Sequence, residues 1–112
     1  MTPITFKHRY HKLASREFTT IRGSAQFKRL HRGDRVEVQT PDETFPCEIM
    51  ALELKRVADM TVAFLKADAE YPGFEIRDRQ DFVDLLNSFR APMWKQVTMD
   101  GELTIITLRR CG

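Results

Sequence analysis

The sequence has few of the residues that mark several common classes of protein. Its 112 residues include two cysteines and five glycines. No apolar run approaches the roughly 18 residues that a transmembrane helix needs. Two cysteines cannot build the disulfide framework of a small secreted domain, and the first residues lack the apolar stretch of a secretory signal. We therefore expect a cytoplasmic protein that does not span a membrane.

Motifs for cofactors and metals are equally scarce. The glycines are scattered singly, so there is no glycine-rich loop of the kind that cradles phosphates in nucleotide-dependent enzymes. No Cys-x-x-Cys pair is present, and His8, His11 and either cysteine have no spacing that fixes a metal site. We expect no cofactor and no bound metal, a buried Cys47, and histidines that are exposed or face phosphates.

Size and composition indicate one ordinary globular domain over residues 1–112. With 42% hydrophobic and 30% charged residues, the chain can bury one modest core. The charge is uneven: residues 1–36 carry nine Lys or Arg and two acids, whereas residues 37–92 carry six and twelve. A basic first third beside an acidic middle predicts a polarised surface with one side suited to phosphates. The alternative is that the two parts neutralise each other across the fold.

The pattern of apolar residues predicts strands at both ends of the chain. A first strand begins at Ile4, and alternation predicts further strands over residues 18–22, 35–39, 47–56, 94–99 and 102–108. Asp100-Gly101 predicts a type I′ hairpin turn between the last two. Because parallel β-α-β alternation is absent, we expect an α+β fold, a small and mostly antiparallel β-barrel with two or three short helices.

The segments between these strands include the predicted helices. We expect a helical turn or two over residues 10–15, and a single turn pinned to the core by Phe27 and Leu30. Asp59 is expected to cap a short helix, and Asp78 to open a longer one. In the longer helix, apolar residues at helical spacing predict a core stripe without a ligand role, made of Phe82, Leu85, Leu86 and Phe89.

The strand over residues 18–22 carries the most distinctive polar pattern. Side chains two residues apart share a face of a strand, so Arg16, Thr20 and Arg22 point one way while Glu17 points the other. A hydroxyl between two guanidinium groups suits an anionic or hydrogen-bond-rich ligand. A basic loop follows, and its candidate contacts to RNA phosphates are Lys28, Arg29, Arg32 and Arg35.

The motifs in this region resemble those of the ASCH domain. They are Thr20-Ile21-Arg22, which follows the small-residue turn at residues 14–16, and Gly33-Asp34-Arg35-Val36 further along the chain. ASCH domains are small β-barrels related to the PUA domains of RNA-modifying proteins. The resemblance therefore implies that fold and a ligand that is RNA or resembles a nucleotide.

One branch of that family is similar in more detail. Its members are small amidohydrolases that remove the acetyl group from the exocyclic amine of acetylcytidine with a Lys, a Thr and a Glu. The resemblance aligns Thr20 and Arg22 with the family's Thr and Arg, and Glu70 with its Glu. At the lysine position this chain has Glu17, which reverses the charge, although a buried glutamate can also act as a base. Strand parity points Glu17 away from Thr20 unless the strand begins at Phe18.

These observations give three functional hypotheses. The first is a domain that binds RNA, a nucleoside or a nucleotide in a cleft lined by Arg16, Thr20, Arg22 and Glu70. The second is an amidohydrolase acting on acetylcytidine or a related amide, with Thr20, Glu70 and Glu17 as its catalytic residues. The third is a protein-interaction module that uses the acidic helix over residues 78–89.

Overall fold

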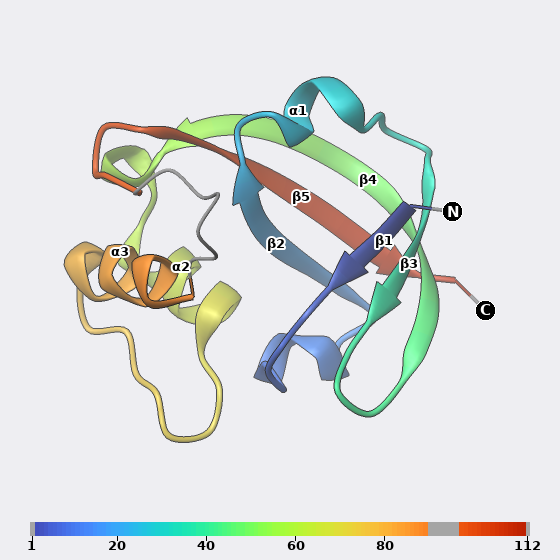
Figure 1. Cartoon of the computed structure of the whole chain (residues 1–112), viewed down its shortest axis with the longest axis horizontal. Helices are drawn as coiled ribbons and strands as arrows, with labels where there is room; N and C mark the ends of the chain where they lie inside the picture. Colours follow the sequence, from blue (N-terminus) through green and yellow to red (C-terminus); the bar gives the residue numbers. More distant parts are fainter. Residues whose placement is uncertain (1, 90–96, 112) are drawn as a thin grey trace.

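The computed structural model describes residues 2–89 and 97–111 of the chain. At its centre a five-stranded sheet, in the order β1-β3-β4-β5-β2, curls into a half-barrel (Figure 1). The strands are β1 (Thr2–Thr5), β2 (Glu17–Gly23), β3 (Arg35–Gln39), β4 (Thr44–Arg56) and β5 (Glu102–Arg110). Among these strands only β1 and β3 pair in parallel. The predicted α+β class and the mostly antiparallel, barrel-like sheet are confirmed.

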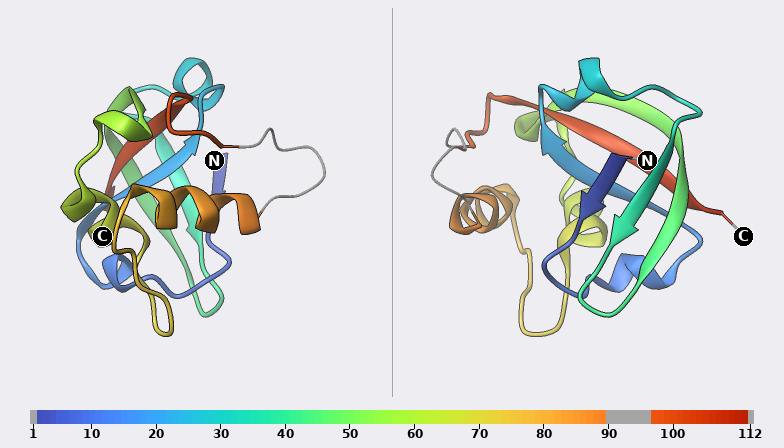
Figure 2. Two further views of the ribbon diagram at one scale, coloured as in Figure 1. Left: turned by 90° about the vertical axis from the view of Figure 1, so that its left-hand side faces the viewer. Right: turned by 45° about the vertical axis from the view of Figure 1, so that its right-hand side comes forward.

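Short helices occupy the connections between the strands. They are the 3₁₀ helices η1 (His11–Ala14) and η2 (Val57–Asp59) and the α-helices α1 (Gln26–Arg29), α2 (Val62–Ala69) and α3 (Arg79–Ser88). Helices α2 and α3 lie together to one side of the sheet (Figure 2). None of the helices in the described part of the chain is long and apolar enough to cross a membrane.

Alternation along the strands buries two separate apolar layers. In β3, Val36 and Val38 are fully buried while their neighbours are not, as the two-residue period of a strand requires. They belong to a cluster inside the curl of the sheet that includes Phe18, Cys47, Ile49, Ile106 and Leu108. A second cluster, between the opposite face of the sheet and the helices, includes Ile21, Leu65, Ile76, Phe82 and Ile105. The predicted burial of Cys47 is confirmed.

The helix predicted to open at Asp78 is confirmed as α3. The Asp78 carboxylate accepts a hydrogen bond from the backbone N–H of Asp81 at 2.8 Å and so caps the first turn. The predicted turn near residue 27 is also present as α1, but Phe27 is 39% exposed. Leu30, which is buried directly after α1, therefore pins that turn to the core without Phe27.

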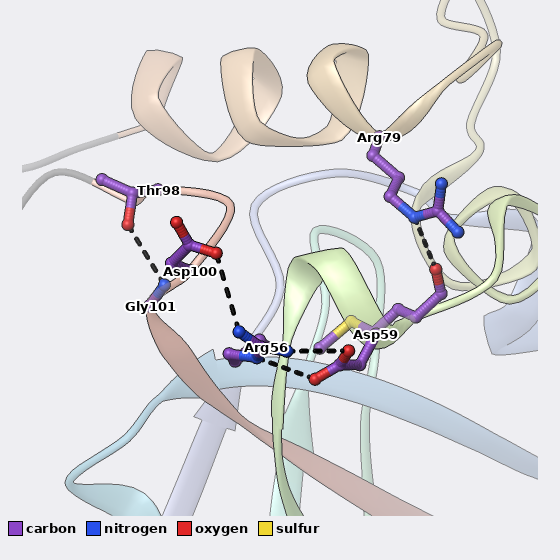
Figure 3. A network of polar contacts seen from close by, with 7 residues as sticks. Arg56, Asp59, Arg79, Thr98, Asp100 and Gly101 are labelled. Atoms are coloured by element: carbon purple, nitrogen blue, oxygen red, sulfur yellow. Dashed lines mark hydrogen bonds and ion pairs between the residues drawn. The ribbon is translucent and has the colours of Figure 1, made fainter.

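The cap predicted for the preceding helix is wrong. Thr61 caps α2, because its hydroxyl oxygen accepts a hydrogen bond from the backbone N–H of Phe64 at 3.1 Å. Asp59 follows Arg56 by three residues in the sequence, and its Oδ2 forms an ion pair with Nε of Arg56 at 2.8 Å. That bidentate pairing draws the Asp59 carboxylate away from the helix and toward the end of β4 (Figure 3).

The hairpin predicted before β5 is wrong, because residues 97–99 do not form a strand. The rest of the strand predicted there, residues 94–96, lies outside the described residues. Neither Asp100 nor Gly101 has the positive φ that a type I′ turn requires. Instead the Gly101 N–H donates to the Thr98 hydroxyl at 3.1 Å (Figure 3). The physical reason is that β5 already pairs with β4 on one side and β2 on the other, so it offers no free edge.

Candidate functional site

A cleft of about 260 Å³ lies beside the end of β1, strand β2 and helices α2 and α3. Its polar lining residues include Lys12, Thr20, Arg22 and Asp68, and its apolar ones include Phe6, Ile21, Phe82, Leu85, Leu86 and Phe89. An apolar hollow with a few convergent polar groups is the usual form of a small-molecule site. The α3 stripe predicted to serve only the core thus also forms one wall of this cleft.

A buried ion pair forms the polar side of the cleft. The ammonium nitrogen Nζ of Lys12 donates to Oδ1 of Asp68 at 3.0 Å, and the hydroxyl of Thr19 donates to the same oxygen at 2.7 Å. The side chains of Lys12 and Asp68 are only 8% and 5% exposed. Sequence reasoning missed this pair, because its members lie 56 residues apart and neither belongs to a recognisable motif.

The Lys12 ammonium group loses its proton more easily in the cleft than it would in water, because its pKa is lowered. Burial lowers the pKa of Lys12, since the ammonium group gives up its hydration, and the nearby charge of Arg22 acts in the same direction. The Asp68 carboxylate opposes this effect by stabilising the ammonium. Aromatic rings fix its position as well: Nζ lies 5.3 Å from the ring centroid of Phe6 and 5.2 Å from that of Tyr10.

Arg22 bridges the two open edges of the half-barrel. Its Nε donates to the Thr20 hydroxyl oxygen at 3.1 Å, and its Nη2 donates to the backbone carbonyl of Thr5 at 3.0 Å. Its guanidinium carbon also lies 4.9 Å from the ring centroid of Phe6. Burial lowers the pKa of Arg22, yet a guanidinium stays charged in proteins. Arg22 lines the cleft, and among the described residues its other N–H groups have no acceptor, so they can donate to a ligand.

The structure brings some of the predicted site residues together and separates others. Thr20, 3% exposed, and Arg22 both line the cleft. Glu70 is the C-cap of α2 and is not a lining residue; its backbone carbonyl accepts a hydrogen bond from the His11 N–H. Asp68, two residues earlier, supplies the carboxylate of the cleft instead.

The remaining predicted residues lie on the surface. Arg16 and Glu17 are exposed, and β2 begins at Glu17, so strand parity turns this side chain away from Thr20. The four cations predicted to contact RNA are also exposed, and they are Lys28, Arg29, Arg32 and Arg35. Among the residues that the structure describes, no group of three His, Cys, Asp or Glu side chains is placed to hold a metal ion.

Aromatic rings gather at one side of the cleft. The imidazole of His8 stacks on the ring of Tyr71, with centroids 4.8 Å apart and planes within 5°. The His8 ring also meets that of Phe89 at 5.0 Å, and Tyr10 meets Tyr71 edge-on at 5.2 Å. Of these four residues, His8, Tyr10 and Phe89 line the cleft. They provide flat surfaces against which a planar ligand can stack.

Tyr10 is expected to titrate far above an ordinary tyrosine. Burial, with the nearby Tyr71 and Asp68, raises the pKa of Tyr10 to about 12. The chain has two tyrosines, so an ultraviolet titration of the wild type minus that of Tyr10→Phe isolates this group. Because the folded state holds the proton more tightly, stability contributed by Tyr10 is complete below pH 10.0 and is lost as the pH rises toward about 12. Ionisation near pH 10.0 would contradict the placement of this ring.

Comparison with known proteins supports the fold and identifies a relative. No protein-family model matches the chain. The structure is similar to the crystal structure of protein EF3133 from Enterococcus faecalis V583, described as DUF984, with a TM-score of 0.61 and 12% sequence identity. The match covers 88% of this chain and 63% of that one. At this identity the likeness shows a shared fold alone, so membership of the ASCH family is not confirmed and stays a prediction.

A sequence relative gives the family. The uncharacterized protein MJ0364 of Methanocaldococcus jannaschii is 44% identical to this chain over 112 residues, which covers 98% of this chain and 96% of that protein. Identity of this extent over nearly the full length of both proteins means that they share one fold and one ancestry. The chain belongs to the same family as MJ0364.

Proposed function

We propose that the cleft binds the base of a nucleoside or nucleotide through its polar edge. The observation that carries this proposal is the buried Lys12–Asp68 pair beside Arg22. Oδ1 of Asp68 accepts two hydrogen bonds, whereas Oδ2 has no hydrogen-bond partner within the described residues. Oδ2 can therefore accept from an exocyclic amine, while Lys12 and Arg22 can donate to a neighbouring ring nitrogen or carbonyl.

Cytosine presents this pattern, since its amine lies next to two acceptors along one edge. The apolar lining contributed by Phe6, Leu86 and Phe89 would contact the faces of such a ring. The lining also holds three basic side chains, Lys7, Lys12 and Arg22, against the single carboxylate of Asp68, which favours a neutral or anionic ligand. In this proposal Asp68 supplies the carboxylate that the resemblance to the acetylcytidine amidohydrolases assigns to Glu70.

The proposal predicts that cytidine binds more tightly than uridine. Uridine has a carbonyl in place of the amine, and this oxygen would face the Asp68 carboxylate. The expected difference is about 1–3 kcal/mol, the cost of a buried polar group without its partner. Arg22→Gln should weaken cytidine binding by a similar amount, whereas Arg35→Gln removes the same charge from an exposed position of β3 and serves as the control. Calorimetry that finds equal affinity for the two nucleosides, or none for either, would contradict base recognition.

A second candidate function is hydrolysis of an acylated exocyclic amine. The observation that favours it is the placement of Lys12: the cleft contains a buried lysine with a lowered pKa, although position 17 does not supply one. Neutral Lys12 would take the proton of Thr20 as its hydroxyl oxygen attacks the acetyl carbon. The carbon–nitrogen bond then breaks, the amine regains a proton, and water releases acetate from Thr20. Arg22 would stabilise the negative charge on the carbonyl oxygen.

The protein-interaction hypothesis has less support. The apolar face of α3 is occupied by the core and the cleft, and the acids of this helix have local partners. Asp81 forms an ion pair with Arg77 at 3.2 Å, and Asp84 accepts a hydrogen bond from Gln80 at 2.8 Å. A partner would have to recognise α3 by its polar face alone.

A further inference from the structure

A second cleft, of about 480 Å³, opens beside the first. It is lined by β1, by part of α1 and by Arg22 of β2, so it lies at the edges where the half-barrel is open (Figure 1). Thr5 and Arg22 line both clefts. The hydrogen bond between Arg22 Nη2 and the Thr5 carbonyl, 3.0 Å long, is thus a boundary that the two clefts share.

The two clefts differ in charge. The first contains the carboxylate of Asp68, whereas the described lining of the second contains two arginines, Arg22 and Arg29, and no acid. Within the described residues, neither Arg29 nor its neighbour Lys28 takes part in an ion pair. The described lining of the second cleft therefore lacks a carboxylate to pair with a base amine, but offers guanidinium groups that match the oxygens of a phosphate.

The side chains around Arg29 add hydrogen-bonding groups without adding negative charge. Thr2 and Gln26 line the same cleft and can each donate to a phosphate oxygen. The backbone of β1 rises roughly 10 Å from Thr2 to Thr5, at about 3.3 Å for each residue. A whole nucleotide, from the amine edge of its base to its phosphate, is of similar length.

We propose that the ligand is a nucleotide that occupies both clefts. Its base lies in the first cleft, its sugar crosses the bridge between Arg22 and Thr5, and its phosphate is bound by Arg29 in the second cleft. This inference rests on the proposed recognition of a base and adds a phosphate subsite to it. The nucleotide is either free or one residue of a single RNA strand, whose next phosphates would meet the exposed Lys28 and Arg32.

The test compares cytidine, 5′-CMP and 3′-CMP by calorimetry on the wild type, Arg29→Gln and Lys28→Gln. One of the two monophosphates should bind at least about tenfold more tightly than cytidine, the effect of one charge-assisted hydrogen bond. Arg29→Gln should remove that advantage and leave cytidine binding unchanged. Lys28→Gln removes the same charge from the adjacent position outside the cleft, and should change affinity less than about threefold, as for a solvent-screened charge.

Three results would overturn the subsite. Equal binding of cytidine and both monophosphates would remove the need for a phosphate site, while leaving base recognition intact. Equal losses in Arg29→Gln and Lys28→Gln would mean that the general positive field acts, rather than Arg29 in its cleft. If the wild type binds neither cytidine nor a monophosphate, recognition of the base itself fails, and the subsite fails with it.

A short oligocytidylate separates the two sources of the nucleotide once the subsite is found. Single-stranded RNA is identified if the oligocytidylate binds more tightly than the monophosphate and its affinity depends on salt. The slope of log affinity against log salt should then be roughly −0.7 for each phosphate neutralised. Binding no tighter than the monophosphate identifies the free nucleotide. Both results support occupation of the two clefts by one nucleotide.

Discussion

Asp68→Ala is expected to lower the free energy of unfolding by roughly 3–5 kcal/mol, because it leaves a buried ammonium without its counter-charge. Lys12 is 8% exposed and its ammonium group lies close to the rings of Phe6 and Tyr10, so little water can replace the lost carboxylate. The variant also removes the acceptor for the Thr19 hydroxyl. Since small domains are stable by only about 5–15 kcal/mol, this variant should lie close to the limit of folding. Urea denaturation followed by circular dichroism measures the loss.

Two further variants show whether the uncompensated charge is the cause. Adding Lys12→Met to Asp68→Ala removes both charges and should recover most of the lost stability. Asp59→Ala breaks the ion pair with Arg56, in which the side chains of Arg56 and Asp59 are 48% and 47% exposed. It should lower the free energy of unfolding far less, because water screens both charges. A loss for Asp68→Ala no larger than that for Asp59→Ala would show that the buried pair has no special part in stability.

If the second candidate function is correct, Thr20→Ala is expected to abolish release of cytidine from acetylcytidine, a loss of about a thousandfold or more, because the nucleophile is gone. Binding of cytidine should weaken only slightly, since at most one hydrogen bond of about 0.5–1.5 kcal/mol is lost. Lys12→Arg should have an equally severe effect on turnover, because a guanidinium can pair with Asp68 but cannot give up its proton. Chromatography of the reaction mixture measures the cytidine released.

The pH dependence of turnover separates a base from a structural lysine. Lys12 acts as a base only when neutral, and its lowered pKa means that turnover should rise with pH at values below those of an exposed lysine. Glu17→Lys, which introduces at an exposed position the lysine that the similar acetylcytidine amidohydrolases have there, should leave turnover unchanged. Full activity in Thr20→Ala or Lys12→Arg would place any hydrolysis outside this cleft. Activity that appears only in Glu17→Lys would show that hydrolysis needs a lysine at position 17, and that Lys12 does not act as the base.

The parts of the fold that follow from local chemistry could be predicted from the sequence. The strand predicted over residues 35–39 is β3, and the strand over 18–22 is β2 with one residue added at each end, because alternation is a direct consequence of strand geometry. The Asp78 cap was likewise visible, since a cap involves only its own turn. The strand predicted over residues 94–99 is absent from the described residues 97–99. Distant strands, β2 and β4, take both edges of β5 instead, and the local sequence does not record that pairing.

The candidate site was less accessible to sequence reasoning for the same reason. Thr20 and Arg22 lie on one strand, so their common face could be derived. Lys12 and Asp68 meet only because η1 and α2 pack against each other, and no local pattern records this contact. The choice between Asp68 and Glu70 depends on which side of α2 faces the sheet, and Asp68 is flanked on that side by buried Leu65 and Ala69.

The central place of β5 also affects the order in which the protein can fold. β5 is the last of the described strands in sequence order, yet it lies between β4 and β2 and is the only described strand that pairs with β2. While the ribosome is still adding residues before Glu102, β2 has no partner and the apolar side chains of β2 and β4 remain uncovered. The sheet can therefore be completed only after β5 has been synthesised, through contacts between distant residues that form slowly. Until then the nascent chain exposes β2 without a partner and one unpaired edge of β4, the kind of surface that chaperones recognise.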